Sequence, residues 1–213
     1  MVPLTDASVL GYPMSISCEE IPHHADYRSL GSIPRVEPVL RYASDDNFLG
    51  RNLYAPLDCA WLRREAAEAL EEASAWLGAE YPHLRLRVLD ALRPQRVQEQ
   101  MWLKLKGTDL ERYLAPPEIG SIHSFGMAVD VTLSEDGREL DLGTAFDDMT
   151  DLSHPSLESQ FVATGLLRAE ALNNRRLLRQ ALAAGGFAGI GHEWWHFDLG
   201  DRATVRAVYP RVL

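Results

Sequence analysis

The chain has 213 residues, of which 46% are hydrophobic and 24% are charged, and its formal net charge is −10. This length and composition are typical of one globular domain, so we predict a single domain over residues 1–213. The acidic balance argues against nucleic acids and anionic membranes as partners, because phosphate groups are bound by clustered lysine and arginine.

The first part of the chain predicts an arm without targeting signals. The first twenty residues lack a basic start followed by an apolar run, and no apolar run in the chain reaches about 18 residues, so we expect a cytoplasmic protein. Residues 1–56 are rich in Pro, Gly, Ser and Asp and predict an irregular arm with short strands, packed on the domain. Cys18 and Cys59 lack CxxC spacing, so they predict neither a disulfide framework nor a cysteine metal site.

Hydrophobic periodicity and turn residues define the elements that follow. Apolar residues recur at helical spacing after Asp58, a plausible N-cap, and again before Gly185-Gly186. The Asp136-Gly137 pair is typical of a hairpin turn. Helices around a mostly antiparallel sheet indicate an α+β domain. In chain order we expect a helix from Asp58 to Gly78, a strand over 84–88, a helix from Pro94 to Gly107, a loop-rich stretch over 107–126, strands over 127–133 and 139–142, a helix over 168–184 and a strand over 193–199.

Two short segments carry the most specific chemical pattern. SIHSFGMAVDVTL contains His123 and Asp130, and GHEWWHFDLG contains Glu193 and His196. Two histidines and a carboxylate are a known catalytic zinc set, which leaves the fourth coordination position to water or substrate. A carboxylate outside the coordination shell then supplies the general base. Asp130 lies in an otherwise apolar strand, where a carboxylate is costly to bury without a cation or hydrogen-bond donors.

A competing arrangement uses residues 192–196, which match HExxH. In that motif both histidines bind zinc from one face of a helix, with the glutamate as base. Preceding glycines and internal tryptophans favour a strand here, on which His192 and His196 would lie about 13 Å apart along the axis, too far to share a metal. The preferred set has its own requirement, since residues three apart on an ideal strand face opposite sides. We therefore expect a bend or bulge between Glu193 and His196, or a loop position for Glu193.

Six short segments, distributed from about residue 18 to residue 198, carry a resemblance to a known family. They are YASDDNF (42–48) with Gly50, DALRP (90–94), SIHSFGMAVD (121–130), LGTAFD (142–147), NRRL (174–177) and EWWH (193–196). In this order they resemble the D-alanyl-D-alanine dipeptidases of the VanX type. SxHxxGxAxD followed by ExWWH is the most specific part of the resemblance.

The resemblance implies a fold, a metal and a reaction centre. The fold would be a single α+β domain with a central, mostly antiparallel sheet flanked by helices, like that of hedgehog domains and D-Ala-D-Ala peptidases. His123, Asp130 and His196 would hold one zinc ion per chain, and Glu193 would be the catalytic base. Arg93 would polarise the scissile carbonyl and stabilise the oxyanion.

The resemblance also implies contacts with a small dipeptide substrate. Ser121 would bind the substrate carboxylate, Tyr42 and Asp147 would meet the free amino group, and Asp90 would complete this set by orienting its neighbours. Two of the assigned residues have a simpler alternative: Arg93 can form an ion pair with Asp90 at a strand end, and Asp147 can be a turn residue.

The predicted function is hydrolysis of a dipeptide, in the first place D-alanyl-D-alanine, with a part in cell-wall metabolism. Ala91, Leu92 and Phe125 depart from the family's usual glycine, aromatic and arginine, which affects pocket shape but removes no ligand. One alternative is a carboxypeptidase that removes D-alanine or cleaves an L,D bond in cell-wall peptides. Another is a zinc-bearing binding module without catalysis, which Glu193 and Arg93 argue against because a structural zinc site needs neither.

Overall fold

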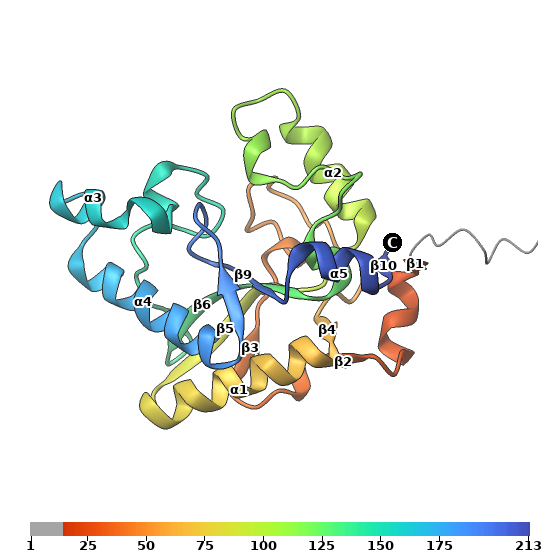
Figure 1. Cartoon of the computed structure of the whole chain (residues 1–213), viewed down its shortest axis with the longest axis horizontal. Helices are drawn as coiled ribbons and strands as arrows, with labels where there is room; N and C mark the ends of the chain where they lie inside the picture. The colour runs from red at the N-terminus through yellow and green to blue at the C-terminus, as the bar shows by residue number, and fades with distance from the viewer. Residues whose placement is uncertain (1–14) are drawn as a thin grey trace, which may run out of the picture.

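The computed structural model describes residues 15–213, and Figure 1 shows their arrangement. Residues 1–14, which include the start of the predicted arm and most of the segment in which a leader was not expected, lie outside the described residues. Over residues 15–213, no helix combines the length and the apolar character needed to cross a bilayer. The predicted cytoplasmic location and the division into one domain stay predictions.

A six-stranded sheet forms the centre of the molecule. Along the sheet the strands follow the order β3, β5, β6, β9 and β8, and β7 pairs with β6. Only β3 and β5 are parallel, so the predicted α+β fold with a mostly antiparallel sheet is confirmed. The strands are β3 (Val36–Pro38), β5 (Leu84–Asp90), β6 (Ala128–Glu135), β7 (Arg138–Glu139), β8 (Phe187–Gly189) and β9 (His196–Leu199).

Two long helices cover one face of this sheet. Helices α1 (Arg64–Glu80) and α4 (Ala169–Ala184) pack on each other and on the sheet, while α2 (Gln95–Leu105) lies on the opposite side (Figure 1). The remaining helices are α3 (Glu158–Ala163) and α5 (Arg202–Val208). Two small sheets join β1 (Ser15–Ile16) to β10 (Arg211–Val212) and β2 (Tyr27–Ser29) to β4 (Trp61–Arg63).

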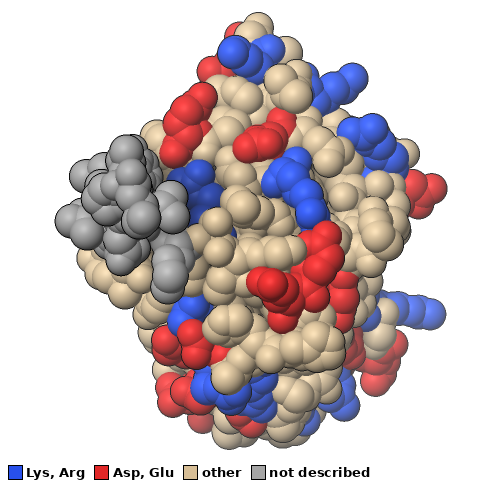
Figure 2. Space-filling model, turned by 90° about the vertical axis from the view of Figure 1, so that its right-hand side faces the viewer, with Lys and Arg blue, Asp and Glu red and all other residues tan. Residues whose placement is uncertain are grey.

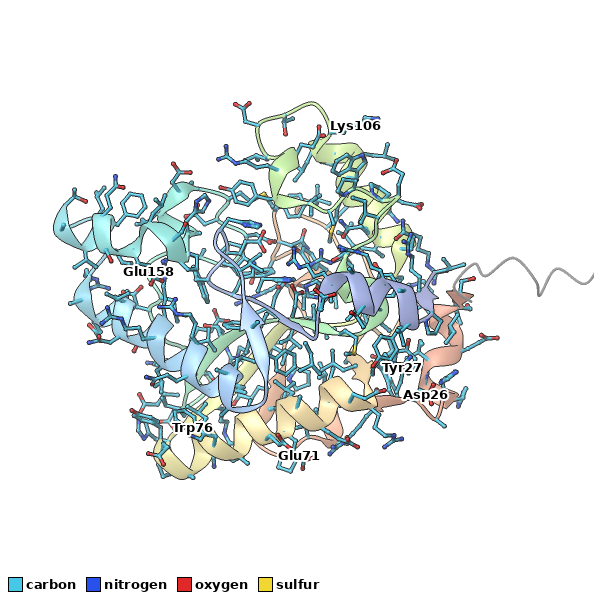
Figure 3. All side chains as sticks on the ribbon, viewed as in Figure 1. Asp26, Tyr27, Glu71, Trp76, Lys106 and Glu158 are labelled. Atoms are coloured by element: carbon cyan, nitrogen blue, oxygen red, sulfur yellow. The ribbon has the colours of Figure 1, made fainter. Side chains whose placement is uncertain are left out.

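Alternation along the strands separates an apolar face from a polar one. Leu86 pairs with Leu133 and Val88 with Val131, and all four are fully buried in the main core with α1 and α4. Side chains fill the space between α1 and the sheet, and Glu71 and Trp76 mark α1 in Figure 3. The opposite face of the sheet therefore remains available for polar groups.

The structure corrects the start and end of the first predicted helix. Residues 61–63 pair with β2, so α1 begins at Arg64, and Asp58 accepts hydrogen bonds from the Ala60 amide and the Trp61 indole instead of capping it. The helix also continues past Gly78. A Cβ at that position would lie 2.5 Å from the Arg35 Nε, so this glycine makes room for an arginine and does not end the helix.

Three other predicted elements change in extent. The second hairpin strand covers only Arg138–Glu139, and the last strand begins at His196 instead of residue 193. The arm is more integrated than expected, because its residues 36–38 form β3 at the edge of the central sheet. The predicted helices over 94–107 and 168–184 are confirmed as α2 and α4, with ends that differ by one or two residues.

Candidate active site

Three acidic or basic side chains form a row across the middle of the sheet. Asp130 on β6 lies directly opposite Asp90 on β5 and His196 on β9. Residues paired in this way present their side chains on the same face of a sheet. Strand pairing alone thus gathers residues from positions 90, 130 and 196 on the polar face.

A bulge in β5 brings Asp90 into this row. The register shifts between Val88 and Asp90, which pair with Val131 and Asp130 respectively. In a regular strand Val88 and Asp90 would face the same side, toward the apolar core. The extra residue turns Asp90 to the polar face, which avoids an unpaired carboxylate in the core.

His123 reaches the same point from a short 3₁₀ helix over residues Ile122–Phe125, which we call η6. Gly126 ends it in the left-handed conformation, with φ 67°, and its Cα lies close to the Arg63 backbone nitrogen, which a Cβ would approach to 3.0 Å. A side chain here would therefore be strained as well as crowded. The turn directs the His123 ring onto the row.

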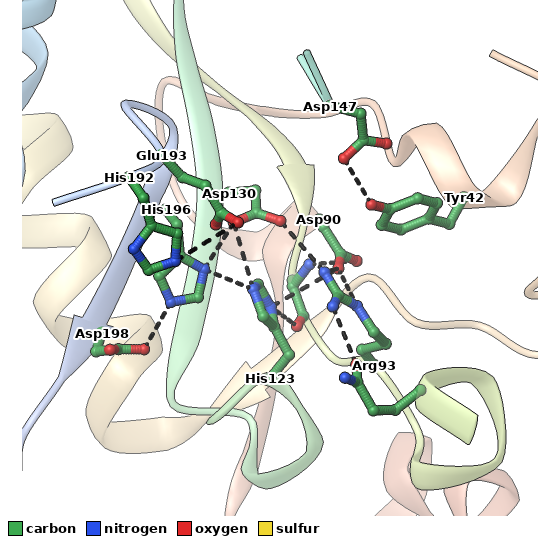
Figure 4. Close-up of polar contacts among 12 residues, drawn as sticks. Tyr42, Asp90, Arg93, His123, Asp130, Asp147, His192, Glu193, His196 and Asp198 are labelled. Carbon is green, nitrogen blue, oxygen red and sulfur yellow. Dashed lines mark hydrogen bonds and ion pairs between the residues drawn. The ribbon is translucent and has the colours of Figure 1, made fainter. Parts of the chain in front are cut away.

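His123, Asp130 and His196 converge to form what we call the ligand triangle. The His123 Nε2 lies 3.2 Å from the His196 Nδ1 and 3.3 Å from the Asp130 Oδ1. The third side, from the His196 Nδ1 to the Asp130 Oδ1, is 3.0 Å (Figure 4). All three residues are buried and can hold a metal ion with one donor atom each.

Each histidine of the triangle is oriented by its other ring nitrogen. The His123 Nδ1 lies 2.7 Å from the Ala91 carbonyl oxygen, and the His196 Nε2 lies 2.8 Å from the Asp198 Oδ1. Asp198 is held in turn by the Arg202 Nε at 2.5 Å. Such outer contacts fix the ring orientation and the tautomer of metal-binding histidines. They leave the His123 Nε2 and the His196 Nδ1 as the donors that face the triangle.

The charges around the triangle suit a bound cation. Burial lowers the pKa of His196, but Asp198 and Asp130 outweigh this and raise it to about 10. Burial raises the pKa of Asp130, but His123 and His196 outweigh it and hold that pKa far below its usual range. The raised pKa of His196 shows that the buried carboxylates create a negative potential at this ring, which favours a metal ion as well as a proton.

Glu193 lies in the turn before β9, beside the triangle and outside it. The expected loop position is thus observed, and it removes the conflict between a spacing of three and a strand. Burial raises the pKa of the Glu193 carboxyl to about 7, with a further contribution from the charge of Asp130. A carboxyl with a pKa near neutrality can both accept and release a proton.

Arg93 is held rigidly beside the triangle. Its Nε donates to the Asp90 Oδ2 at 2.8 Å, its Nη1 to the Gln98 Oε1 at 3.1 Å and its Nη2 to the Asp130 Oδ2 at 3.3 Å. The ion pair with Asp90 is therefore present. The three hydrogen bonds together leave two of the five guanidinium N–H donors for another oxygen.

Asp90 itself stays behind this arginine. It is fully buried and is absent from the residues that line the cavity, and it also accepts hydrogen bonds from the Tyr54 hydroxyl and the Ala91 amide. These contacts are those expected of a residue that orients its neighbours, and the grouping of Asp90 with the substrate-binding residues stays a prediction. Its carboxylate orients Arg93 and does not reach the ligand space.

Tyr42 and Asp147 form a second polar group in the same cavity. The Tyr42 hydroxyl donates to the Asp147 Oδ1 at 2.9 Å, whereas the Asp147 Oδ2 is buried without a partner in the described part of the chain. Asp147 has a φ of 61°, an unusual value for a residue other than glycine. Burial raises the pKa of its carboxyl to about 8. An unsatisfied acceptor held in a strained conformation is a candidate binding point for a cation.

The cavity that contains these groups is small. Its volume is about 180 Å³, and its walls include Ser121, Glu193, the triangle and the Tyr42–Asp147 pair. Pockets for drug-sized ligands occupy about 300–1,000 Å³. The space therefore suits a ligand of a few residues at most.

The HExxH alternative does not fit this geometry. Residues 192–195 form an irregular, bent segment and no helix, and the metal-binding group found among residues 15–213 contains His196 but not His192. The His192 ring lies 6.0 Å from the Tyr113 ring and 6.4 Å from the His154 ring, at the wall of the cavity.

Two contributors to the site were missed in the sequence. Asp198 follows His196 by two positions on β9, so strand periodicity could have placed the two on one face. Arg175 belongs to the NRRL segment, but no role was assigned to it. Its Nε and Nη2 donate to the carbonyl oxygens of Leu142 and Leu152 at 2.6 and 3.0 Å, so it supports the loop that carries Asp147.

Comparisons with known proteins identify the family of the chain. Residues 25–212 match the family described as D-ala-D-ala dipeptidase. The D-alanyl-D-alanine dipeptidase of Escherichia coli (strain K12) is 36% identical and covers 80% of this chain and 82% of its own length. Those of Enterococcus faecium and Streptomyces coelicolor are 31% and 33% identical, over 76% and 75% of this chain and 84% and 83% of their own lengths. The chain therefore belongs to the D-alanyl-D-alanine dipeptidase family of peptidases.

Proposed function

We propose that this chain is a zinc-dependent dipeptidase that hydrolyses D-alanyl-D-alanine to two molecules of D-alanine. The observation that carries the proposal is the ligand triangle with a separate, half-buried carboxyl, Glu193, beside it in a small cavity. The names of the relatives support the choice of substrate.

The donor set fits one zinc ion per chain. Nitrogen and oxygen donors about 2.0–2.1 Å from a tetrahedral zinc lie roughly 3.3 Å apart, and the sides of the triangle measure 3.0, 3.2 and 3.3 Å. Two histidines and a carboxylate leave the fourth position open, as catalytic zinc sites do. Bound zinc supplies Lewis acidity, which acidifies water and polarises the scissile carbonyl.

Glu193 moves the protons of the reaction. With a pKa of about 7, its carboxylate form accepts a proton from the attacking water, and the resulting acid delivers it to the leaving amine nitrogen. Arg93 directs its free N–H donors at the carbonyl oxygen, where negative charge develops as water adds. Because Asp90 and Gln98 hold the guanidinium in place, this stabilisation requires no reorganisation during the reaction.

Two groups fix the ends of the dipeptide. The unpartnered Asp147 Oδ2 and the Tyr42 hydroxyl bind the ammonium group, which gives the buried carboxylate the cation it lacks. Ser121, which also lines the cavity, donates to the substrate carboxylate. A small cavity that pairs both ends selects a free dipeptide over a longer peptide.

Glu193→Gln tests the proposal. The variant should bind zinc at one equivalent per chain and lose about 10²–10⁴-fold in kcat, because the amide cannot accept the proton. Zinc content by elemental analysis and D-alanine release from D-alanyl-D-alanine give the two readouts. Full activity in the zinc-loaded variant would exclude Glu193 as the base.

A substrate panel separates the dipeptidase from a carboxypeptidase. The wild-type chain should release D-alanine from D-alanyl-D-alanine and leave L-alanyl-L-alanine and a cell-wall pentapeptide uncleaved. Cleavage of the pentapeptide at a rate comparable to that of the dipeptide would contradict selection for a dipeptide by the small cavity and favour the carboxypeptidase.

A further inference from the structure

An arginine on α5 lines the cavity without taking part in the proposed chemistry. α5 packs against η6, so the two elements form one wall that carries Arg206, Ser121 and His123. Arg206 is half-buried and therefore does not extend freely into solvent. Because Arg206 lies on the same wall as Ser121, the two side chains can contact the same ligand.

Arg206 differs from the other arginines of the cavity in its ion pairing. Arg93 pairs with Asp90 at 2.6 Å, the Arg202 Nε with Asp198 at 2.5 Å, and the Arg112 Nη2 with Asp151 at 3.6 Å. Within residues 15–213, Arg206 has no carboxylate oxygen within 4.0 Å. Among the arginines of the cavity, Arg206 is therefore the one whose positive charge has no ion pair within residues 15–213.

One backbone carbonyl group orients the Arg206 guanidinium. Its Nε and Nη2 donate to the Gly120 oxygen at 3.2 and 3.0 Å, and the next residue is Ser121. Five N–H donors are available, so three remain beyond these two contacts. The neighbouring Arg202 adds positive charge and, together with burial, lowers the pKa of Arg206, although an arginine stays protonated at neutral pH.

The cavity wall thus carries groups of both charges. Asp147 and Glu193 supply carboxyl groups, and Arg206 supplies a cation that has no ion pair within residues 15–213. This cation lies next to Ser121, because its hydrogen bonds go to the adjacent Gly120. A dipeptide carries an ammonium and a carboxylate separated by only a few ångströms. A guanidinium with parallel N–H donors matches a carboxylate better than an ammonium or an amide does.

We propose that Arg206, together with Ser121, binds the C-terminal carboxylate of the dipeptide and makes hydrolysis depend on that charge. This inference rests on the proposed function, because it takes a dipeptide as the ligand. It assigns α5 a role in specificity: a substrate whose C-terminus is amidated or extended loses the ion pair and leaves the guanidinium desolvated.

Binding to a chain that cannot turn over provides the test. In the Glu193→Gln background, loaded with zinc, calorimetry would measure Kd for D-alanyl-D-alanine and for D-alanyl-D-alaninamide. We expect the free acid to bind about 10- to 100-fold more tightly than the amide. Arg206→Gln should abolish this preference, and Arg206→Lys should retain part of it because the charge is kept.

Arg211→Ala is the matched control. The Arg211 side chain also donates to carbonyl groups of the 117–119 segment, at 3.1 Å to Pro117 and 2.9 Å to Ile119, but it does not line the cavity. It should keep the preference for the acid. If Arg206→Gln weakens the acid and the amide equally, or if Arg211→Ala abolishes the preference as well, Arg206 only supports the loop and the inference is overturned.

The same variants distinguish this inference from the proposed function. If the chain with Glu193 intact hydrolyses D-alanyl-D-alanine while Arg206→Gln keeps the preference for the acid, the inference fails and the dipeptidase stands. If the preference depends on Arg206 but the intact chain cleaves no dipeptide, the carboxylate site stands and the dipeptidase fails.

Discussion

The two polar groups of the cavity are supported in different ways. The ligand triangle lies on adjacent strands of the central sheet and on η6, and the second nitrogen of each histidine is fixed by a carbonyl or a carboxylate. Tyr42 instead comes from a short 3₁₀ helix (Arg41–Ala43) and Asp147 from a turn, both outside the central sheet, and one oxygen of Asp147 has no partner among residues 15–213.

This difference matches the demands of the two tasks. A metal requires donors at fixed distances, and rigid strands supply them more accurately than loops. A substrate must enter and leave, so its binding group must remain unsatisfied until the ligand arrives. On the face in Figure 2, positive and negative side chains are interspersed, and the lining of the cavity likewise contains residues of both charges.

The largest expected effect comes from removing a corner of the triangle. His123→Ala should lose stoichiometric zinc and with it essentially all hydrolysis, because two remaining ligands do not make a stable site. His192→Ala is the matched control: it should keep one zinc per chain, because His192 lies outside the triangle. Elemental analysis after dialysis measures both. Retained zinc in His123→Ala together with lost zinc in His192→Ala would instead support the HExxH arrangement.

A smaller effect tests whether the outer contacts of the triangle matter. Asp198→Asn keeps the shape of the side chain but removes the charge that pairs with His196 at 2.8 Å. Loss of such a contact typically costs about 10–100-fold in metal affinity or activity. Competition with a chelator would measure zinc affinity. An unchanged affinity would show that strand geometry alone positions the ring.

The sequence predicts the metal-binding residues of the site better than the residues that support them. The strands that carry Asp130 and His196 have clear hydrophobic patterns, so their convergence with His123 could be proposed from residue type and spacing. The bulge that turns Asp90 to the polar face has no signature in LRLRVLD, and its rigid support of Arg93 emerges only from the register of β5 and β6.

Contacts made by the backbone are also invisible in the sequence. The Ala91 carbonyl orients His123, and because it is a backbone group, no residue type in the sequence indicates this contact. The start of α1 was misplaced for a related reason: Trp61 and Leu62 fit a helical period, and only pairing with the distant β2 makes them a strand. At the start of α1, a tertiary contact outweighed the local preference for a helix.

The smallest expected effect concerns stability at the Asp147 end and is measured on zinc-free chain. The Asp147 pKa of about 8 lies above the ordinary 3.8, so between these pH values the folded chain holds a proton that the unfolded chain has released. Unfolding free energy therefore falls as pH rises, by at most about 1.4 kcal/mol per pH unit from this group. Asp147→Asn should flatten the decline between pH 5 and pH 8, as urea unfolding at several pH values would show. Equal slopes in the two proteins would mean that the carboxyl is ionised without a ligand, and the contrast between a satisfied triangle and an unsatisfied Asp147 would fail.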